Sequence, residues 1–168
     1  MLGVTQFLAN AAGVALEQED TTAARDYALE ALGIRSEIGA RVALSSLSSI
    51  LAMLALRQDD FNLARFHLRE YANDSFRAGA FGWGNFFLTA AAEVAARVNK
   101  PVLAATFLGA RSVVPDGMLA NDPPLLARSN AYSTEAARAT LGVAEFEKAF
   151  DAGKRLSREE AFQLAAEI

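Results

Sequence analysis

The sequence predicts an all-α protein, a solenoid of about three helical hairpins of forty residues each followed by C-terminal capping helices. Three observations lead to this prediction. The chain holds 36 Ala and 21 Leu residues against 20 Val, Ile and Thr residues together, and Ala and Leu favour helix over sheet. Proline is confined to positions 101, 115, 123 and 124, so helices can follow one another through the first hundred residues. The third observation is an internal repeat.

The repeat emerges when residues 16–40 are written above residues 56–80. Several positions then coincide without a gap, namely Leu16/Leu56, Gln18/Gln58, Asp20/Asp60, Ala24/Ala64, Arg25/Arg65, Glu30/Glu70, Gly39/Gly79 and Ala40/Ala80. The same register adds a third copy, in which Ala recurs in four columns, 12/52/92, 15/55/95, 24/64/104 and 40/80/120. Chance predicts about 0.4 such columns at this Ala content, so the repeat divides the chain into units 1–40, 41–80 and 81–120.

Each unit is expected to form a helical hairpin. On one face of the first helix a large residue is followed by small ones, as in Phe7, Ala11, Ala12 and Ala15, which lets another helix approach closely. Leu47 and Phe87 begin the corresponding faces of the second and third units. A hairpin of this kind cannot bury its apolar face alone, so the three units are expected to stack.

The second helix of each unit carries start and stop signals. Asp20 and Asp60 are good N-cap residues, and in the third unit Lys100 precedes Pro101, which suits the first position of a helix. Glycine commonly ends a helix, so Gly39 and Gly79 are expected to end the second helices of the first two units.

After the third hairpin the register is lost. Residues 114–124 carry three of the four prolines and are expected to form a loop. Helices are expected over residues 125–141 and 143–154, separated by Gly142, and from Ser157 onward, where Ser157 and Glu160 form a capping box. Residues 121–168 are thus expected to cap the stack within a single domain, 1–168.

Charge and composition exclude several kinds of protein. With no Cys, the chain can form neither a disulfide nor a thiolate metal site. The net charge of −4, without any basic block, argues against direct nucleic-acid binding. The apolar run over residues 42–56 is too short to cross a bilayer, and the N-terminus lacks the basic region of a signal peptide. We therefore expect a cytoplasmic protein that does not contact membranes.

The residues that could take part in catalysis or phosphate binding are each explained by a structural role. His67, the single histidine, has no catalytic partner at a recognisable spacing. The pairs Asp59–Asp60 and Glu159–Glu160 fall at helix starts, where the helix dipole favours carboxylates. Gly82–Trp83–Gly84 follows no strand, so it is expected to loosen the start of the next helix, with Trp83 packing nearby, rather than to cradle phosphate. The sequence therefore predicts no enzyme activity, no metal and no cofactor.

The pattern of a small residue at the packing site of each second helix resembles that of the tetratricopeptide repeat. These residues are Ala24, Ala64 and Ala104. The period of forty departs from the usual spacing of about 34 residues and implies longer helices. Ala28 and Leu68 also stand where that repeat often has an aromatic residue. The resemblance implies a right-handed α-α superhelix.

The C-terminal half is similar to the helical-repeat region of LuxR-type or MalT-like transcriptional regulators, which contain a STAND ATPase, and of related cyclase-like signalling regulators. The similarity rests on Leu108–Gly109–Ala110, Pro123–Pro124, Leu141–Gly142, Phe146, Phe150, Gly153, Leu156–Ser157 and Glu160–Ala161. In those proteins the region senses an inducer or binds a partner, which implies an isolated regulatory piece here. This chain contains neither the phosphate loop nor a helix-turn-helix after its repeats.

The resemblance places candidate binding residues on a concave face lined by the first helices. In the first unit they are Gln6, Gly13 and Glu17; in the second and third they are Ser46, Ser49, Met53, Arg57, Phe86, Thr89, Glu93 and Arg97. Such side chains suit a peptide or a small polar ligand. Alternatively, they are solvated surface residues, with Glu93 and Arg97 forming an i,i+4 pair.

Two functions follow as hypotheses. The first is a non-catalytic scaffold within a signalling regulator that binds a protein segment, other domains of that regulator or another copy of itself. The second is a sensor whose small-molecule inducer binds in the concave groove. The first helix, with Leu2, Val4, Phe7 and Leu8, lacks a polar cap, so it is expected to pair with a second chain or with a further repeat.

Overall fold

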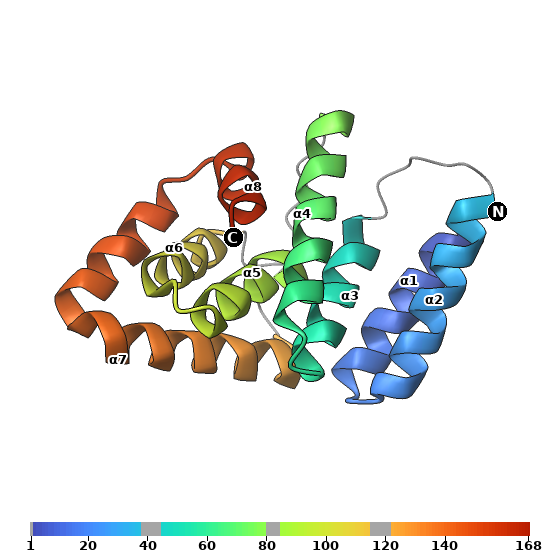
Figure 1. Ribbon diagram of the computed structural model, residues 1–168, viewed down its shortest axis with the longest axis horizontal. Helices are drawn as coiled ribbons and strands as arrows, with labels where there is room; N and C mark the ends of the chain where they lie inside the picture. The colour runs from blue at the N-terminus through green and yellow to red at the C-terminus, as the bar shows by residue number, and fades with distance from the viewer. Residues whose placement is uncertain (1, 38–44, 80–84, 115–121) are drawn as a thin grey trace.

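The computed structural model describes residues 2–37, 45–79, 85–114 and 122–168, and all regular structure within these ranges is helical. The helices in order are α1 (Leu2–Glu17), α2 (Thr21–Glu37), α3 (Ser45–Arg57), α4 (Phe61–Ala78), α5 (Asn85–Arg97), α6 (Pro101–Ser112), α7 (Pro124–Lys154) and α8 (Arg158–Ala166). The prediction of an all-α protein is therefore confirmed. Figure 1 shows α1–α2, α3–α4 and α5–α6 as hairpins, with α7 running along the third.

The forty-residue repeat is present in the backbone. The first helices of the three hairpins end at Glu17, Arg57 and Arg97, one period apart. Each turn then places a non-glycine residue in the left-handed region, at Glu19 (φ 63°), Asp59 (φ 55°) and Asn99 (φ 56°). The following amide of each turn donates to a carbonyl five residues earlier, at 2.9, 3.0 and 2.8 Å. The three hairpin turns therefore share one geometry.

The predicted caps of the second helices are confirmed where the structure describes them. Asp20 and Asp60 each accept a hydrogen bond, at 2.9 Å, from the amide three residues further on. Lys100 precedes Pro101 at the start of α6. Gly79 ends α4 with φ 59°. Gly39 and residues 82–84 lie outside the described residues.

The Ala columns lie where helices meet. All members of the 12/52/92, 15/55/95 and 24/64/104 columns are buried, whereas the column 40/80/120 lies outside the described residues. The first helices contact one another, α1 against α3 and α3 against α5, and α2 and α4 contact the first helix of the next hairpin. Small side chains at these positions let the helices pack closely.

The apolar face expected to lack a cap on the first helix is exposed at Phe7. Phe7 is 69% exposed, whereas its repeat equivalents Leu47 and Phe87 are fully buried. Phe87 packs edge-on against Tyr71 of α4, the second helix of the preceding hairpin, with ring centroids 4.7 Å apart. In the described part of the chain no hairpin lies on the corresponding side of α1, so Phe7 faces solvent.

The C-terminal helices follow the sequence signals closely. α7 begins at Pro124, packs against α5 and α6, and is interrupted at Gly142 (φ 74°, ψ 171°), as the expected break between two helices requires. The Ser157–Glu160 capping box is formed at the start of α8. α8 returns to α4, where Phe162 stacks on Phe87 at 4.3 Å.

The second half of α7 crosses α6 at two glycines. A Cβ atom at Gly109 would lie 1.9 Å from the Phe150 carbonyl oxygen, and one at Gly153 would lie 1.9 Å from the Thr106 carbonyl oxygen. Only glycine permits the two backbones to approach this closely. This contact fixes where α7 lies after its bend.

Candidate functional site

Five residues expected to be exposed on the concave face are buried instead, four of them in the second and third hairpins. Ser49, Met53, Thr89 and Glu93 are each at most 1% exposed. The first helices pack directly on one another and α7 lies on α5, so this face is largely filled by the chain itself. Arg57, Arg97 and Phe86 are partly buried, and Ser46 lies in α3 with its side chain outside the described residues. In the first hairpin Gln6 is exposed, Glu17 partly buried and Gly13 buried.

Three of the candidate residues form an ionic cluster. Arg57 Nη2 donates to Glu93 Oε2 at 2.6 Å, and Arg97 Nη2 donates to Glu93 Oε1 at 3.3 Å. The side chain of Glu93 is 1% exposed, whereas those of Arg57 and Arg97 are 26% and 29% exposed. One buried carboxylate thus joins α3 to α5 through Arg57 and also pairs with Arg97 of its own helix, and both cations reach solvent.

Helix α7 adds two partners to this cluster. Arg57 Nη2 donates to Ser129 Oγ at 3.3 Å, and the Arg97 guanidinium lies over the Tyr132 ring at 4.2 Å. A further interaction lies next to it, where Arg111 donates to Thr89 Oγ1 at 2.9 Å and pairs with Asp122. Side chains from the start of α7 therefore occupy the place expected for a bound ligand along the third hairpin.

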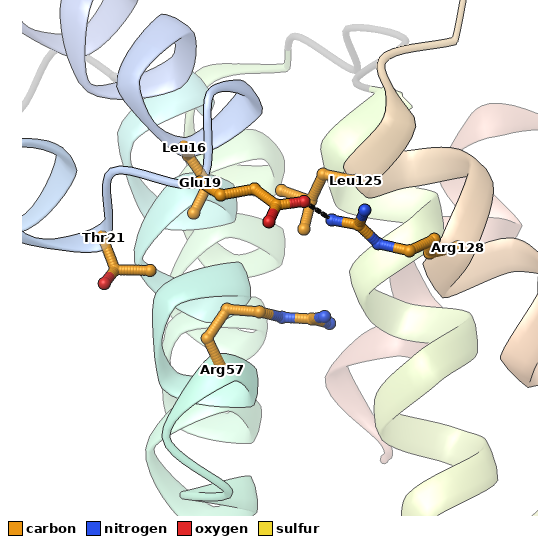
Figure 2. A pocket seen from close by; sticks show the side chains of 6 residues that line it. All are labelled: Leu16, Glu19, Thr21, Arg57, Leu125 and Arg128. Carbon is orange, nitrogen blue, oxygen red and sulfur yellow. Dashed lines mark hydrogen bonds and ion pairs between the residues drawn. The ribbon is translucent and has the colours of Figure 1, made fainter.

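An open cleft remains beside the cluster. It has a volume of about 390 Å³ and lies where the α1–α2 turn, the end of α3 and the first turns of α7 meet. Figure 2 shows its lining, which consists of Leu16, Glu19, Thr21, Arg57, Leu125 and Arg128. Two leucines supply apolar walls and two arginines supply positive charge. Of these residues, only Arg57 was a candidate from the sequence.

The electrostatic environment of the cleft favours an anion. Leu125 belongs to the first turn of α7, so the positive end of this helix borders the cleft, whereas the Asp20 carboxylate already caps α2 beside Thr21. Pro123, the N-cap residue of α7, forms no side-chain cap hydrogen bond. The Nε of Arg57 is buried and lacks a hydrogen-bond partner. Glu19 pairs with Arg128 across the cleft, as the dashed line in Figure 2 marks.

The sequence carried no signal for most of this lining. Glu19 and Arg128 are 109 positions apart and meet only because α7 lies beside the first hairpin. Glu19 occupies the left-handed position of its turn, as Asp59 and Asn99 do in theirs, but no sequence pattern indicated that it would face α7. Sequence reasoning therefore found one residue of the cleft and missed its other charged groups.

The ionisable side chains that the sequence singled out, His67 and the acidic pairs at helix starts, lie in packing or capping contacts. His67 is partly buried on α4, edge-on to Phe66 at 5.4 Å, and its desolvation lowers the pKa of the imidazole. Asp60 caps α4, and Asp59 pairs with Arg97 at 3.7 Å. In the capping box, hydrogen bonds from Ser157 lower the pKa of Glu160. Among the described residues, no three His, Asp or Glu side chains cluster in a way that would hold a metal ion.

Comparison of the chain with protein-family models, curated proteins and solved structures finds no match. Within the ranges that the structure describes, no helix is both long and apolar enough to cross a membrane.

Proposed function

We propose that the chain is a non-catalytic recognition scaffold that binds an acidic segment of a partner protein through the cleft between the first hairpin and α7. The observation that carries this proposal is the lining of the cleft, where Arg57 and Arg128 lie with two leucines at the first turn of α7. Arginine recognises carboxylates through charge-assisted, often bidentate hydrogen bonds. Glu19 already pairs with Arg128, which indicates what an incoming carboxylate would replace.

The wider setting is part of the same proposal. We place the chain among tetratricopeptide-like right-handed superhelices, as a cytoplasmic regulatory piece of a LuxR-type or MalT-like transcriptional regulator or of a related signalling regulator. The three hairpins with equivalent turns support the repeat assignment. The close crossing at Gly109 and Gly153 supports the C-terminal resemblance, because both glycines belong to the motif that carries it.

The test is selection of short random peptides on the full chain, followed by affinity measurement using fluorescence anisotropy. We expect the selected peptides to contain Asp or Glu next to apolar residues. Their binding should weaken at least about tenfold with Arg128→Glu, because a charge contact becomes a repulsion. Arg128 is suited to the test because its side chain is 56% exposed, so its replacement should leave the core intact.

The matched control is Arg138→Glu, which reverses a charge of similar exposure on α7 away from the cleft. Its variant should bind the selected peptides as the wild type does. Selected peptides without acidic residues, or equal binding by the Arg128→Glu and Arg138→Glu variants, would refute the proposed site.

A small anionic inducer is the second candidate, favoured by the volume of the cleft, which falls within the range of small-molecule sites. A thermal-shift screen of metabolites, including oligosaccharides, separates the two candidates, because a specific ligand raises the melting temperature by mass action. A stabilising metabolite whose effect disappears with Arg128→Glu, in the absence of selected peptides, would favour the inducer.

A further inference from the structure

A second groove lies on the outer side of the first hairpin, away from the cleft. It has a volume of about 450 Å³ between α1 and α2. Its lining is almost uncharged, with Asp20 as the single ionisable carboxylate, and consists of Phe7, Asn10, Ala11, Val14, Ala15, Gln18, Asp20, Ala23 and Tyr27. Phe7, Val14 and Tyr27 are 69%, 52% and 39% exposed.

The second hairpin has the same groove, one period further on. A cavity of about 250 Å³ there is lined by Leu51, Leu54, Ala55, Gln58, Leu63 and His67, the repeat equivalents of Ala11, Val14, Ala15, Gln18, Ala23 and Tyr27. In this hairpin, however, the groove is bordered by a helix of its neighbour. Arg25, Leu29 and Leu32 of α2 complete its lining.

The contact between α2 and the groove of the second hairpin indicates which kind of helix would bind in the groove of the first hairpin. Arg25, Leu29 and Leu32 are spaced i, i+4 and i+7, so they form one stripe along α2. Arg25 Nη2 donates to Gln58 Oε1 at 3.2 Å, while the two leucines border the apolar part of the groove. Gln18, the equivalent of Gln58, is exposed on the first hairpin. The groove of the first hairpin therefore offers an equivalent glutamine and an apolar lining to a helix bearing the same stripe.

The third hairpin shows the groove closed. Ala91, Val94 and Phe107, at the positions of Ala11, Val14 and Tyr27, are fully buried. The groove is thus bordered by α2 in the second hairpin, and its equivalent positions are buried in the third. A partner helix should therefore present apolar side chains to the lining and place any charge at the exposed rim, as Arg25 does beside Gln58.

We propose that the groove between α1 and α2 docks a helix with an Arg-x3-Leu-x2-Leu stripe, presented by a further hairpin in the same forty-residue register, with the Arg side chain donating to Gln18. We prefer this occupant to a second copy of the chain, because in each copy the stripe on α2 already contacts the α3–α4 hairpin. The inference does not depend on the proposed cleft function.

The experiment extends the full chain by placing a second copy of residues 1–40 directly before Met1. The repeat then continues in register, with equivalent positions of the added and original segments forty residues apart. The added α2 should dock in the groove and raise the melting temperature by at least about 4 °C, because new apolar surface is buried. The rise should disappear with Val14→Asp in the original segment or with Leu29→Asp in the added copy.

Two controls keep the result interpretable. Val143→Asp in the extended chain alters a residue on α7 that is 71% exposed, and it should leave the rise intact. Sedimentation of the chain without extension tests for a second copy as the occupant. The proposal would be overturned if the melting temperature did not rise, or if the rise survived Val14→Asp. It would also be overturned if the unextended chain formed concentration-dependent dimers that Val14→Asp abolished.

Discussion

The first and third hairpins have the same turn geometry but opposite surroundings. Phe7 is 69% exposed and Tyr27 is 39% exposed, whereas Phe87 and Phe107 at the equivalent positions are fully buried. Tyr71 of α4 and Phe162 of α8 enclose Phe87 from two sides. The comparison teaches that the repeat determines which side of a hairpin is apolar, while the neighbouring helices determine whether that side is buried. Each prediction below alters one part of this comparison.

Among substitutions other than those of the two phenylalanines, the largest effect is expected at the closed end, where α7 crosses α6. Gly153→Ala would place a Cβ atom 1.9 Å from the Thr106 carbonyl oxygen, so the two backbones must separate. We expect a loss of about 4 kcal/mol in the free energy of unfolding, measured with urea. The control is Gly33→Ala in α2, where a Cβ atom meets nothing within 4 Å. It should stabilise the chain by about 0.5 to 1 kcal/mol, because Ala favours helix.

The ionic cluster that joins the second and third hairpins should give the next largest effect. Glu93→Gln removes the charge that Arg57 and Arg97 share, and we expect a loss of about 2 kcal/mol, because two partly buried cations are left without their carboxylate. Glu145→Gln breaks an exposed pair with Lys148 and should change stability by less than about 0.5 kcal/mol. Similar losses in the two variants would show that the cluster does not stabilise the stack.

The smallest effect concerns pH and the groove of the second hairpin. Burial lowers the pKa of His67 from its ordinary value of 6.5, so the unfolded chain binds more protons than the folded chain below that pH. The contribution of neutral His67 to stability is therefore present above pH 6.5 and is lost as the pH falls through the lower pKa of the folded state. Urea unfolding at several pH values should show this slope, and His67→Gln should reduce it. An unchanged slope would mean that other groups cause it.

Local sequence signals predicted much of the fold. The turns after Glu17, Arg57 and Arg97, the caps at Asp60 and Ser157, and the break at Gly142 all arise from residues close to one another in the sequence. The positions of helices far apart in sequence could not be predicted in this way. The path of α7 depends on its bend and on the contact between Gly109 and Gly153. Because this path could not be predicted, the burial of Thr89 and Glu93 was not predicted either. The same holds for the ion pair between Glu19 and Arg128.

The difference between the two ends is tested most directly by replacing each of the two equivalent phenylalanines. The free energy of unfolding is measured with urea for Phe87→Ala and for Phe7→Ala. Phe87→Ala should cost about 3 to 5 kcal/mol, because it opens a cavity between Tyr71 and Phe162. Phe7→Ala should change stability by less than about 0.5 kcal/mol, because its side chain is already exposed. Equal losses in the two variants would contradict the account, since they would mean that the first hairpin is covered as the third is.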